Sequence, residues 1–357
     1  MIRTPGWTTR HTGAPRAGRA TAVRLVLPSC WLTLVVVWQL VRPPDGGSGA
    51  APRIATCLAY LTAVVWLVVG VRSAAEREVR RIGHIAEAAQ RVLLRPPPAR
   101  LDGIALAAGQ LSMSRGASVG GDLYEAMATP YGVRIVMGDV RGHGLPAIGA
   151  VAALLGSFRE AAHDEPQLAR VLRRLDRALA RHLRERCRAE HPACGGGEPE
   201  SPLAEEFVTV LLLEIRADGD VYALNCGHPW PYRLGPGAGQ LAPGDPLPPL
   251  GPFPLPADLA PLHCVRLRPG EALCLHTDGA EDARDAAGRF FAFGEALAEA
   301  ARTAPVSPAA VVARVQRALL DHTRGRLSDD VALLVLRNDR VRVPPQPVGS
   351  GAAGVRR

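Results

Sequence analysis

The sequence contains no lysine: all 42 of its basic residues are arginines. Aromatic residues are also scarce, at 4% of the chain, which argues against a stacking platform for single-stranded nucleic acid. Glycine and proline are abundant, with 37 and 32 residues. This combination is typical of a GC-rich genome, so the presence of an arginine at a given position is weaker evidence for a functional role than in most proteins. At 357 residues, with 47% apolar residues, the chain is neither a disulfide-stabilised miniprotein nor wholly disordered.

The net charge of +8 would ordinarily indicate a nucleic acid or an anionic membrane as partner. The charge is unevenly distributed, however. Residues 1–100 carry 14 arginines and four acidic residues, a net charge of +10, whereas residues 101–340 carry 25 arginines and 30 acidic residues, a net charge of −5. The last 17 residues add three arginines. The basic excess is therefore N-terminal, and we expect no nucleic-acid partner.

Two uncharged apolar runs lie inside this basic region, Leu25–Val41 and Ile54–Val71. Each is close to the length of about 17–20 residues that a helix needs to cross a bilayer. A turn-rich loop at 42–53 connects them. Arginines are denser outside the two runs than in the loop, so residues 25–71 are predicted to be a transmembrane hairpin with both termini cytoplasmic. Residues 1–24 are then a basic cytoplasmic N-terminus of a multi-pass protein of the cell membrane.

An alternative is that the first run is a cleaved signal peptide, but the second run and its arginine-rich flank favour retention. Residues 72–98 are predicted to be a linker, helical over 73–95 and stopped by Pro96-Pro-Pro98. Its apolar residues recur at three- and four-residue steps: Val79, Ile82, Ile85, Ala86, Ala89 and Val92. This stripe either pairs two copies in a homodimer or packs against the following domain.

From residue 99 to 338 short apolar runs alternate with helical patterns, which predicts one α+β domain. Tight turns such as Ala217-Asp-Gly-Asp220 indicate antiparallel pairing. The predicted strands are 104–109, 123–129, 133–138, 207–215, 220–225, 230–234, 264–268, 272–276 and 331–336. The predicted helices are 145–162, 166–188, 291–303 and 308–322. Residues 339–357 lack a core pattern and are predicted to be a disordered tail.

Aspartates mark the ends of four predicted strands: Asp122, Asp139 and Asp278, each next to a glycine, and the pair Asp329 and Asp330 after Ser328. Glycine lets the backbone turn sharply and approach an ion closely. Carboxylate oxygens of this kind suit Mg²⁺ or Mn²⁺ if the strand ends converge at one sheet edge. A single Asp-Gly, such as Asp218-Gly219, is an ordinary turn.

Five segments occur in order along the domain: Gly120-Gly-Asp-Leu-Tyr-Glu125, Gly138-Asp-Val-Arg-Gly-His-Gly144, Asn225-Cys-Gly-His-Pro229, Thr277-Asp-Gly-Ala-Glu-Asp-Ala283 and Asp329-Asp-Val-Ala-Leu-Leu-Val335. Together they resemble the metal-dependent PPM phosphatases, in the bacterial branch named for stage II sporulation protein E, over about residues 100–338. The resemblance implies a four-layer α-β-β-α sandwich, two Mn²⁺ or Mg²⁺ ions and hydrolysis of phosphoserine or phosphothreonine. It also implies a phosphorylated regulatory protein, such as an anti-sigma-factor antagonist, as the substrate.

The resemblance assigns roles to single residues. Asp139 would bridge the two metals, Val140 would add its backbone carbonyl, and the other ligands would be Asp122, Asp278, Asp329 and Asp330. The metals would lower the pKa of a bridging water and offset phosphoryl charge. His143 is the candidate general acid; its alternative role is to order the loop. Asn225 and His228 look like scaffold near the site.

The chain departs from the family at Ala332, where Thr is usual, at His276, where Tyr is common, and at Glu125, where Asp is frequent. None of these is a primary ligand, so we expect activity. A zinc site from His182, Cys187, His191 and Cys194 is disfavoured because paired Cys-x2-Cys units are missing. Two alternatives to a phosphatase stay open: a membrane-tethered pseudophosphatase that only binds a partner, and another two-metal enzyme such as a nucleotide cyclase.

Overall fold

The computed structural model describes residues 50–112, 120–142, 144–190, 206–235, 239–302 and 305–340. The chain divides into two units, residues 1–81 and 82–357. The predicted N-terminus, the first apolar run and the tail after Arg340 lie outside the described residues.

The first described element is one helix, α2 (Ala50–Leu93), of 44 residues. It corrects one expectation: residues 50–53 belong to the helix rather than to a loop. The helix runs continuously from the second apolar run into the linker. Pro52 lies in the first turn, where its missing N–H removes no helical hydrogen bond. Within α2, the segment Leu58–Glu78 has a mean hydropathy of 1.7 and is long and apolar enough to cross a membrane; it is the one such segment among the described residues.

Eleven strands among the described residues form two sheets in which all strand pairs are antiparallel, as predicted. In sheet A the strand order is β1 (Arg100–Leu101), β2 (Ile104–Leu111), β11 (Val331–Asn338), β10 (Ala272–His276), β7 (Tyr232–Leu234) and β8 (Gly239–Gln240). In sheet B it is β3 (Asp122–Thr129), β4 (Gly132–Val140), β5 (Val208–Ile215), β6 (Asp220–Cys226) and β9 (Leu262–Arg266).

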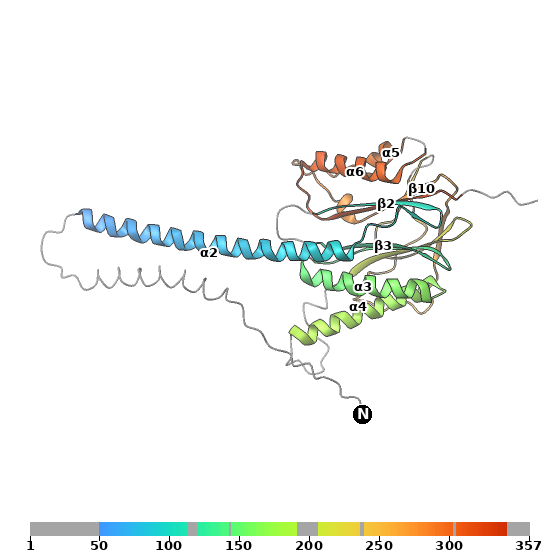
Figure 1. The fold of residues 1–357 in the computed structure, drawn as a ribbon, viewed down its shortest axis with the longest axis horizontal. Coiled ribbons are helices and arrows are strands. Elements are labelled where there is room, and N and C mark those ends of the chain that lie inside the picture. The colour runs from blue at the N-terminus through green and yellow to red at the C-terminus, as the bar shows by residue number, and fades with distance from the viewer. Residues whose placement is uncertain are drawn as a thin grey trace, which may run out of the picture. The chain divides into compact units, whose positions relative to one another are not determined.

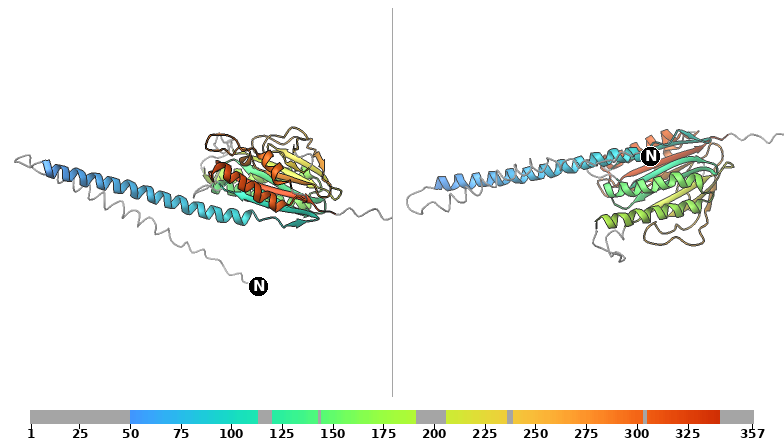
Figure 2. Two further views of the ribbon diagram at one scale, coloured as in Figure 1. Left: turned by 90° about the horizontal axis from the view of Figure 1, so that it is seen from above. Right: turned by 60° about the horizontal axis from the view of Figure 1, so that its bottom comes forward.

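Two pairs of helices cover the outer faces of the sheets (Figures 1 and 2). Helices α5 (Phe293–Ala300) and α6 (Pro308–Thr323) lie on sheet A, and α3 (Leu145–Asp164) and α4 (Leu168–Glu190) lie on sheet B. A short 3₁₀ helix, η2 (Asp278–Ala280), follows β10. The layer order is therefore α-β-β-α, and the predicted four-layer sandwich is confirmed.

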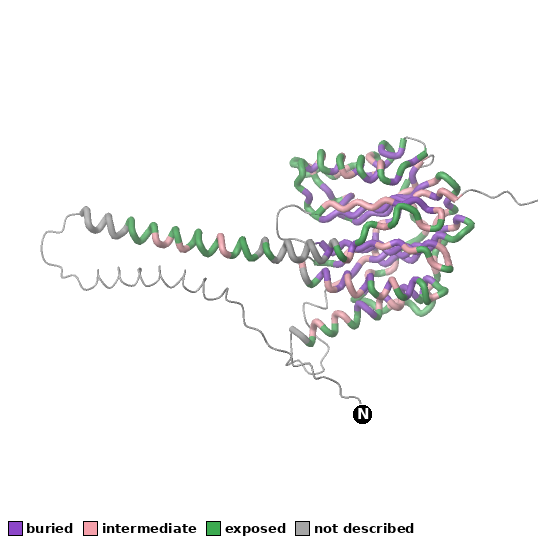
Figure 3. The backbone as a smooth tube through the Cα atoms, viewed as in Figure 1, coloured by how far each residue is buried: buried purple, intermediate pink, exposed green. Residues whose placement is uncertain are grey.

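The sequence of β11 explains why this strand is buried on both faces. Ala332, Leu334 and Leu336 join the apolar core that fills the space toward sheet B, whereas the alternating residues Val331, Leu333 and Val335 join a second core under α5 and α6. Because side chains alternate along a strand, a strand between two apolar layers requires an unbroken apolar run. Figure 3 shows the resulting buried interior of both sheets.

The element boundaries differ from the prediction in a few places. The two-residue strands β1 and β8 were not predicted, the strand expected at 264–268 lies at Leu262–Arg266, and the helix expected at 291–303 is shortened to Phe293–Ala300. Asp339 and Arg340, expected in the tail, belong to the domain. Arg340 Nη2 lies 2.7 Å from Asp102 Oδ2, and Asp339 forms an ion pair with Arg337.

Candidate metal centre

Sheet B supplies the first two carboxylates. Asp122 is the first residue of β3, and it lies directly opposite Asp139 near the end of β4. Residues paired across an antiparallel ladder point to the same face of the sheet. The register therefore brings these two side chains together, as the sequence analysis expected.

Sheet A supplies the other three carboxylates. Asp278 follows the end of β10, and Asp329 and Asp330 precede the neighbouring start of β11. Thr277 connects the two sheets at this point. Its hydroxyl lies 3.4 Å from Asp122 Oδ2 and accepts a hydrogen bond of 2.9 Å from the Ala332 backbone N–H. Ala332, which stands in place of the family's threonine, is thus held through Thr277.

Three glycines allow the segments to approach closely enough for this arrangement. A Cβ atom at Gly120 would overlap with Asp330 Oδ2, and one at Gly279 would overlap with the Asp330 backbone oxygen. A Cβ at Gly121 would overlap with the Val140 carbonyl and would lie 2.8 Å from Asp139 Oδ1. Any larger residue at these positions would push the carboxylates apart, which explains the Gly-Gly-Asp and Asp-Gly motifs physically.

The electrostatics of the cluster favour a cation. Burial, and then repulsion from Asp139, Asp330 and Asp329, raises the pKa of Asp122 well above its usual value. Burial, followed by repulsion from Asp278, Asp329 and Asp330, raises the pKa of Asp139 to about 7. The pKa of Asp278 is also raised, by burial first and by Asp329 second. Divalent cations would allow these groups to stay ionised together.

The five carboxylates of the cluster differ in their exposure to solvent. Asp122 and Asp330 are buried, Asp139 is half-buried, and Asp278 and Asp329 are exposed. Among the described residues, no three His, Cys, Asp or Glu side chains meet in a group that could hold an ion as they stand. Carboxylates that repel one another are expected to sit apart until a cation lies between them. The donor chemistry and the glycine-lined approach fit Mn²⁺ or Mg²⁺, whose preferred ligands are carboxylate oxygens and water.

Behind Asp139 lies a hydrogen-bonded group that sequence reasoning identified only in part. The Asp139 backbone N–H donates to Thr209 Oγ1 at 3.3 Å, and this hydroxyl lies 3.0 Å from Nδ1 of the buried His228. Asn225 in turn bonds the backbone of His228. Asn225 and His228 were expected to be scaffold, and the contacts agree. Thr209 carries no motif signal, whereas Thr277 could have been found because it adjoins Asp278.

Three of the candidate residues from the sequence lie outside the described residues: His143, His191 and Cys194. Arg141 is exposed, with its guanidinium carbon 5.2 Å from the centroid of the Phe207 ring.

Two of the family departures have partners of their own. Glu125 accepts two hydrogen bonds of 2.9 Å from Arg159 Nε. His276 is fully buried, with Nε2 3.1 Å from Glu281 Oε1 and its ring against Phe293.

The fold and this carboxylate-lined edge together define a PPM-type phosphatase domain. The family described as Stage II sporulation protein E (SpoIIE) matches residues 129–339, and the chain belongs to this family.

Solved structures with a similar fold include the RsbU and RsbW domains of a Mycobacterium tuberculosis protein, with 22% identity, a TM-score of 0.50 and coverage of 69% of this chain and 62% of that one. Another is the SiaA-PP2C domain of Pseudomonas aeruginosa, with 19% identity, a TM-score of 0.53 and coverage of 74% and 98%. This chain therefore spans about 62% of the first structure's length. A comparison with curated proteins finds no match.

Proposed function

We propose that this protein is a membrane-anchored, metal-dependent protein phosphatase that hydrolyses phosphoserine or phosphothreonine on a regulatory protein. The observation that carries the proposal is that Asp122, Asp139, Asp278, Asp329 and Asp330 lie near enough at one edge of the two sheets to raise one another's pKa values. These residues come from four separate motifs, and a structural role for so many buried or mutually repelling acids would only cost stability.

In this proposal Asp139, Asp122, Asp278 and Asp329 hold two Mn²⁺ or Mg²⁺ ions, with the Val140 carbonyl and Asp330 as further ligands. When bound, such ions supply an activated water and offset the charge of the transferring phosphoryl group. Gly120, Gly121 and Gly279 allow the segments that carry the ligands to pack closely against one another. His143 is proposed as the general acid from its place in the Gly-His-Gly segment.

The membrane anchor is proposed from two features. Leu58–Glu78 is one apolar helical segment, and Leu25–Val41 is a second apolar run in the sequence. The arginine-rich flanks on their outer sides support a cytoplasmic location for both termini and for the phosphatase domain. The linker stripe supports a homodimer as a further proposal.

The substrate proposal rests on the family. A phosphorylated anti-sigma-factor antagonist is the kind of target that the resemblance implies. The similar structure that contains RsbU and RsbW domains supports a regulatory phosphoprotein, without identifying one.

The decisive experiment measures phosphate release from a phosphoserine peptide by the full chain in detergent micelles with Mn²⁺. We expect turnover that stops with EDTA and falls by several orders of magnitude in Asp139→Asn. Asp218→Asn is the matched control, because Asp218 only accepts a hydrogen bond from the Asp220 N–H in an exposed turn. No turnover by the native chain would favour the pseudophosphatase, and pyrophosphate release from ATP or GTP would favour the cyclase.

A further inference from the structure

One threonine hydroxyl joins the backbone of the proposed bridging ligand to a buried imidazole. Thr209 lies opposite Asp139 in the register of β4 and β5. Its Oγ1 accepts the hydrogen bond from the Asp139 N–H at 3.3 Å, and it lies 3.5 Å from the Asp139 carbonyl oxygen. The same oxygen is 3.0 Å from His228 Nδ1. The hydroxyl therefore contacts the chain between Gly138 and Val140 from one side.

The imidazole itself is held in place by its own turn. Asn225 Nδ2 donates to the His228 carbonyl, and the His228 N–H donates to Asn225 Oδ1, both at 2.8 Å. Gly227, between them, has a φ of 70°, a conformation that favours glycine. His228 is 3% exposed, so its ring has no room to swing into solvent. The Asn-Cys-Gly-His-Pro segment therefore forms a turn that fixes the position of the His228 ring.

The single hydroxyl hydrogen of Thr209 has two possible acceptors. It is donated either to His228 Nδ1, or to the Asp139 carbonyl oxygen at 3.5 Å while the His228 Nδ1–H donates to Thr209 Oγ1. Burial lowers the pKa of His228 to about 3, so the ring is neutral in both arrangements. In both, Thr209 Oγ1 joins the backbone of Asp139 to the imidazole ring of His228.

We propose that Thr209 and His228 are positioning residues that fix the backbone at Asp139 and Val140 and thereby set the geometry of the metal centre. The inference rests on the proposed function, in which the Asp139 carboxylate and the Val140 carbonyl would help to hold the ions. Groups that orient metal ligands without touching the metal typically change metal affinity by about 10–100-fold when they are removed. A small displacement of this backbone would move two ligands at once.

The test measures Mn²⁺ binding to the full chain in detergent micelles by electron paramagnetic resonance of the free ion, which does not depend on activity. Thr209→Val is expected to weaken binding by about tenfold, and Thr209→Ser is expected to restore most of it because the hydroxyl returns. Thr209→Ala provides the same loss of hydroxyl should the valine variant fail to fold. Unchanged affinity in a folded variant without the hydroxyl would overturn the inference.

Thr129→Val is the matched control. Thr129 lies at the other end of β3, where its hydroxyl donates to the Gly132 carbonyl at 2.7 Å. We expect this variant to bind Mn²⁺ like the native chain. An equal loss of affinity in Thr129→Val would mean that any lost threonine hydroxyl weakens the site through general destabilisation, and it would overturn the specific role of Thr209.

Substitutions of His228 test the contact between Thr209 and His228. His228→Asn can keep a hydrogen-bonding atom near the position of Nδ1, whereas His228→Leu cannot, so the leucine variant should lose more Mn²⁺ affinity. The double variant Thr209→Val/His228→Leu should bind no more weakly than the worse single variant, since both act through one chain. Additive losses of Mn²⁺ affinity would show that Thr209 and His228 act independently, which contradicts the inference. If the native chain binds no Mn²⁺, the proposed metal centre fails and this inference with it.

Discussion

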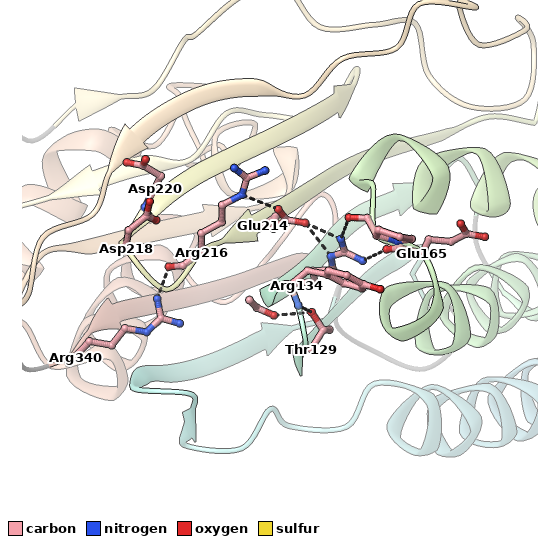
Figure 4. Close-up of polar contacts among 11 residues, drawn as sticks. Thr129, Arg134, Glu165, Glu214, Arg216, Asp218, Asp220 and Arg340 are labelled. Carbon is pink, nitrogen blue, oxygen red and sulfur yellow. Dashed lines mark hydrogen bonds and ion pairs between the residues drawn. The ribbon is translucent and has the colours of Figure 1, made fainter.

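Arg134 and Glu214 form an ion pair inside sheet B, with Arg134 Nη2 2.7 Å from Glu214 Oε2 and side-chain exposures of 0% and 5% (Figure 4). The same guanidinium donates to the carbonyls of Ala162, Glu165 and Pro166, where α3 ends and α4 begins. One arginine therefore ties the α3–α4 connection to the sheet and pairs with Oε2 of Glu214. The other carboxylate oxygen of Glu214, Oε1, accepts a hydrogen bond from Arg216 Nε at 3.1 Å.

Replacing Arg134 with methionine should destabilise the protein by about 3–5 kcal/mol, because Glu214 would stay buried without its main partner. Thermal unfolding, followed by circular dichroism, measures the change. Arg302→Met is the control, since Arg302 pairs with Glu299 on the surface and such pairs contribute about 0–1 kcal/mol. Equal stability of Arg134→Met and the native chain would contradict a structural role for the pair.

The sequence did not reveal this pair. Arg134 follows Val133 and precedes Ile135, and alternation in a strand predicts that such a polar residue faces solvent, yet all three are buried. Asp122, Asp139 and Asp278 were predictable because each adjoins a glycine, and Gly121 and Gly279 are required by close contacts; Asp329 and Asp330 were found as an acidic pair before an apolar strand. Thr209 was not, because Val208-Thr-Val210 has the composition of any buried strand. The start of α2 at Ala50 was missed because Pro52 was interpreted as part of a loop rather than of a first helical turn.

In the metal-free protein, Asp139 should lower the free energy of unfolding as the pH rises from about 4 to about 7. Burial and neighbouring carboxylates raise the pKa of Asp139 to about 7, so in this window its carboxyl group binds more protons in the folded state than in the unfolded state. The buried His228 contributes with the opposite sign, so the native chain is compared with Asp139→Asn at each pH. Asp139→Asn should remove this cost and stabilise the metal-free protein at pH 8, by on the order of 2–4 kcal/mol at 1.36 kcal/mol per pKa unit.

Chemical denaturation at pH 5 and pH 8, in EDTA and in excess Mn²⁺, checks the sign. With Mn²⁺ the order should reverse, and the native chain should be more stable than Asp139→Asn, because only the native chain has the full ligand set. A metal-free Asp139→Asn that is less stable than the native chain at pH 8 would refute the repulsion argument.

Arg141 should contribute to binding of the phosphorylated substrate. Its backbone N–H donates to the Phe207 carbonyl at 2.9 Å, so the pairing of β4 with β5 continues one residue beyond Val140. Alternation then places Arg141 on the same face as Asp139. Arg141→Ala should raise KM for a phosphopeptide by about tenfold, the size of one charge-assisted hydrogen bond of about 1.4 kcal/mol.

In the Arg141→Ala variant, kcat and Mn²⁺ affinity should stay near their native values, because binding of ground state and transition state is weakened alike. Arg302→Ala should leave KM unchanged. A lower kcat with a native KM would instead assign Arg141 to the chemical step.

If α2 is a membrane span, preventing its insertion should move the phosphatase domain to the other side of the membrane. Val65 and Val69 are 54% and 59% exposed within the apolar segment, and an arginine at the centre of a membrane helix costs about 2.5–3.5 kcal/mol. In Val65→Arg/Val69→Arg, the first apolar run should carry the phosphatase domain across the membrane. A C-terminal fluorescent protein that matures only in the cytoplasm should then lose its signal.

Val92→Arg is the matched control, because Val92 is 67% exposed in the same helix but lies beyond the apolar segment. The fluorescence of the Val92→Arg fusion should equal that of the native fusion. A bright, membrane-bound Val65→Arg/Val69→Arg protein would rule out α2 as the second span.

Among the described residues, the last strand along the chain, β11, is the third strand of sheet A, between β2 and β10. During synthesis, the sheet therefore stays split, with two open apolar edges, until β11 has left the ribosome. Asp329 and Asp330 immediately precede the same strand. A polypeptide that ends before them therefore has an incomplete sheet and also lacks two of the proposed ligands, so completion of the fold and of the proposed metal site are one event.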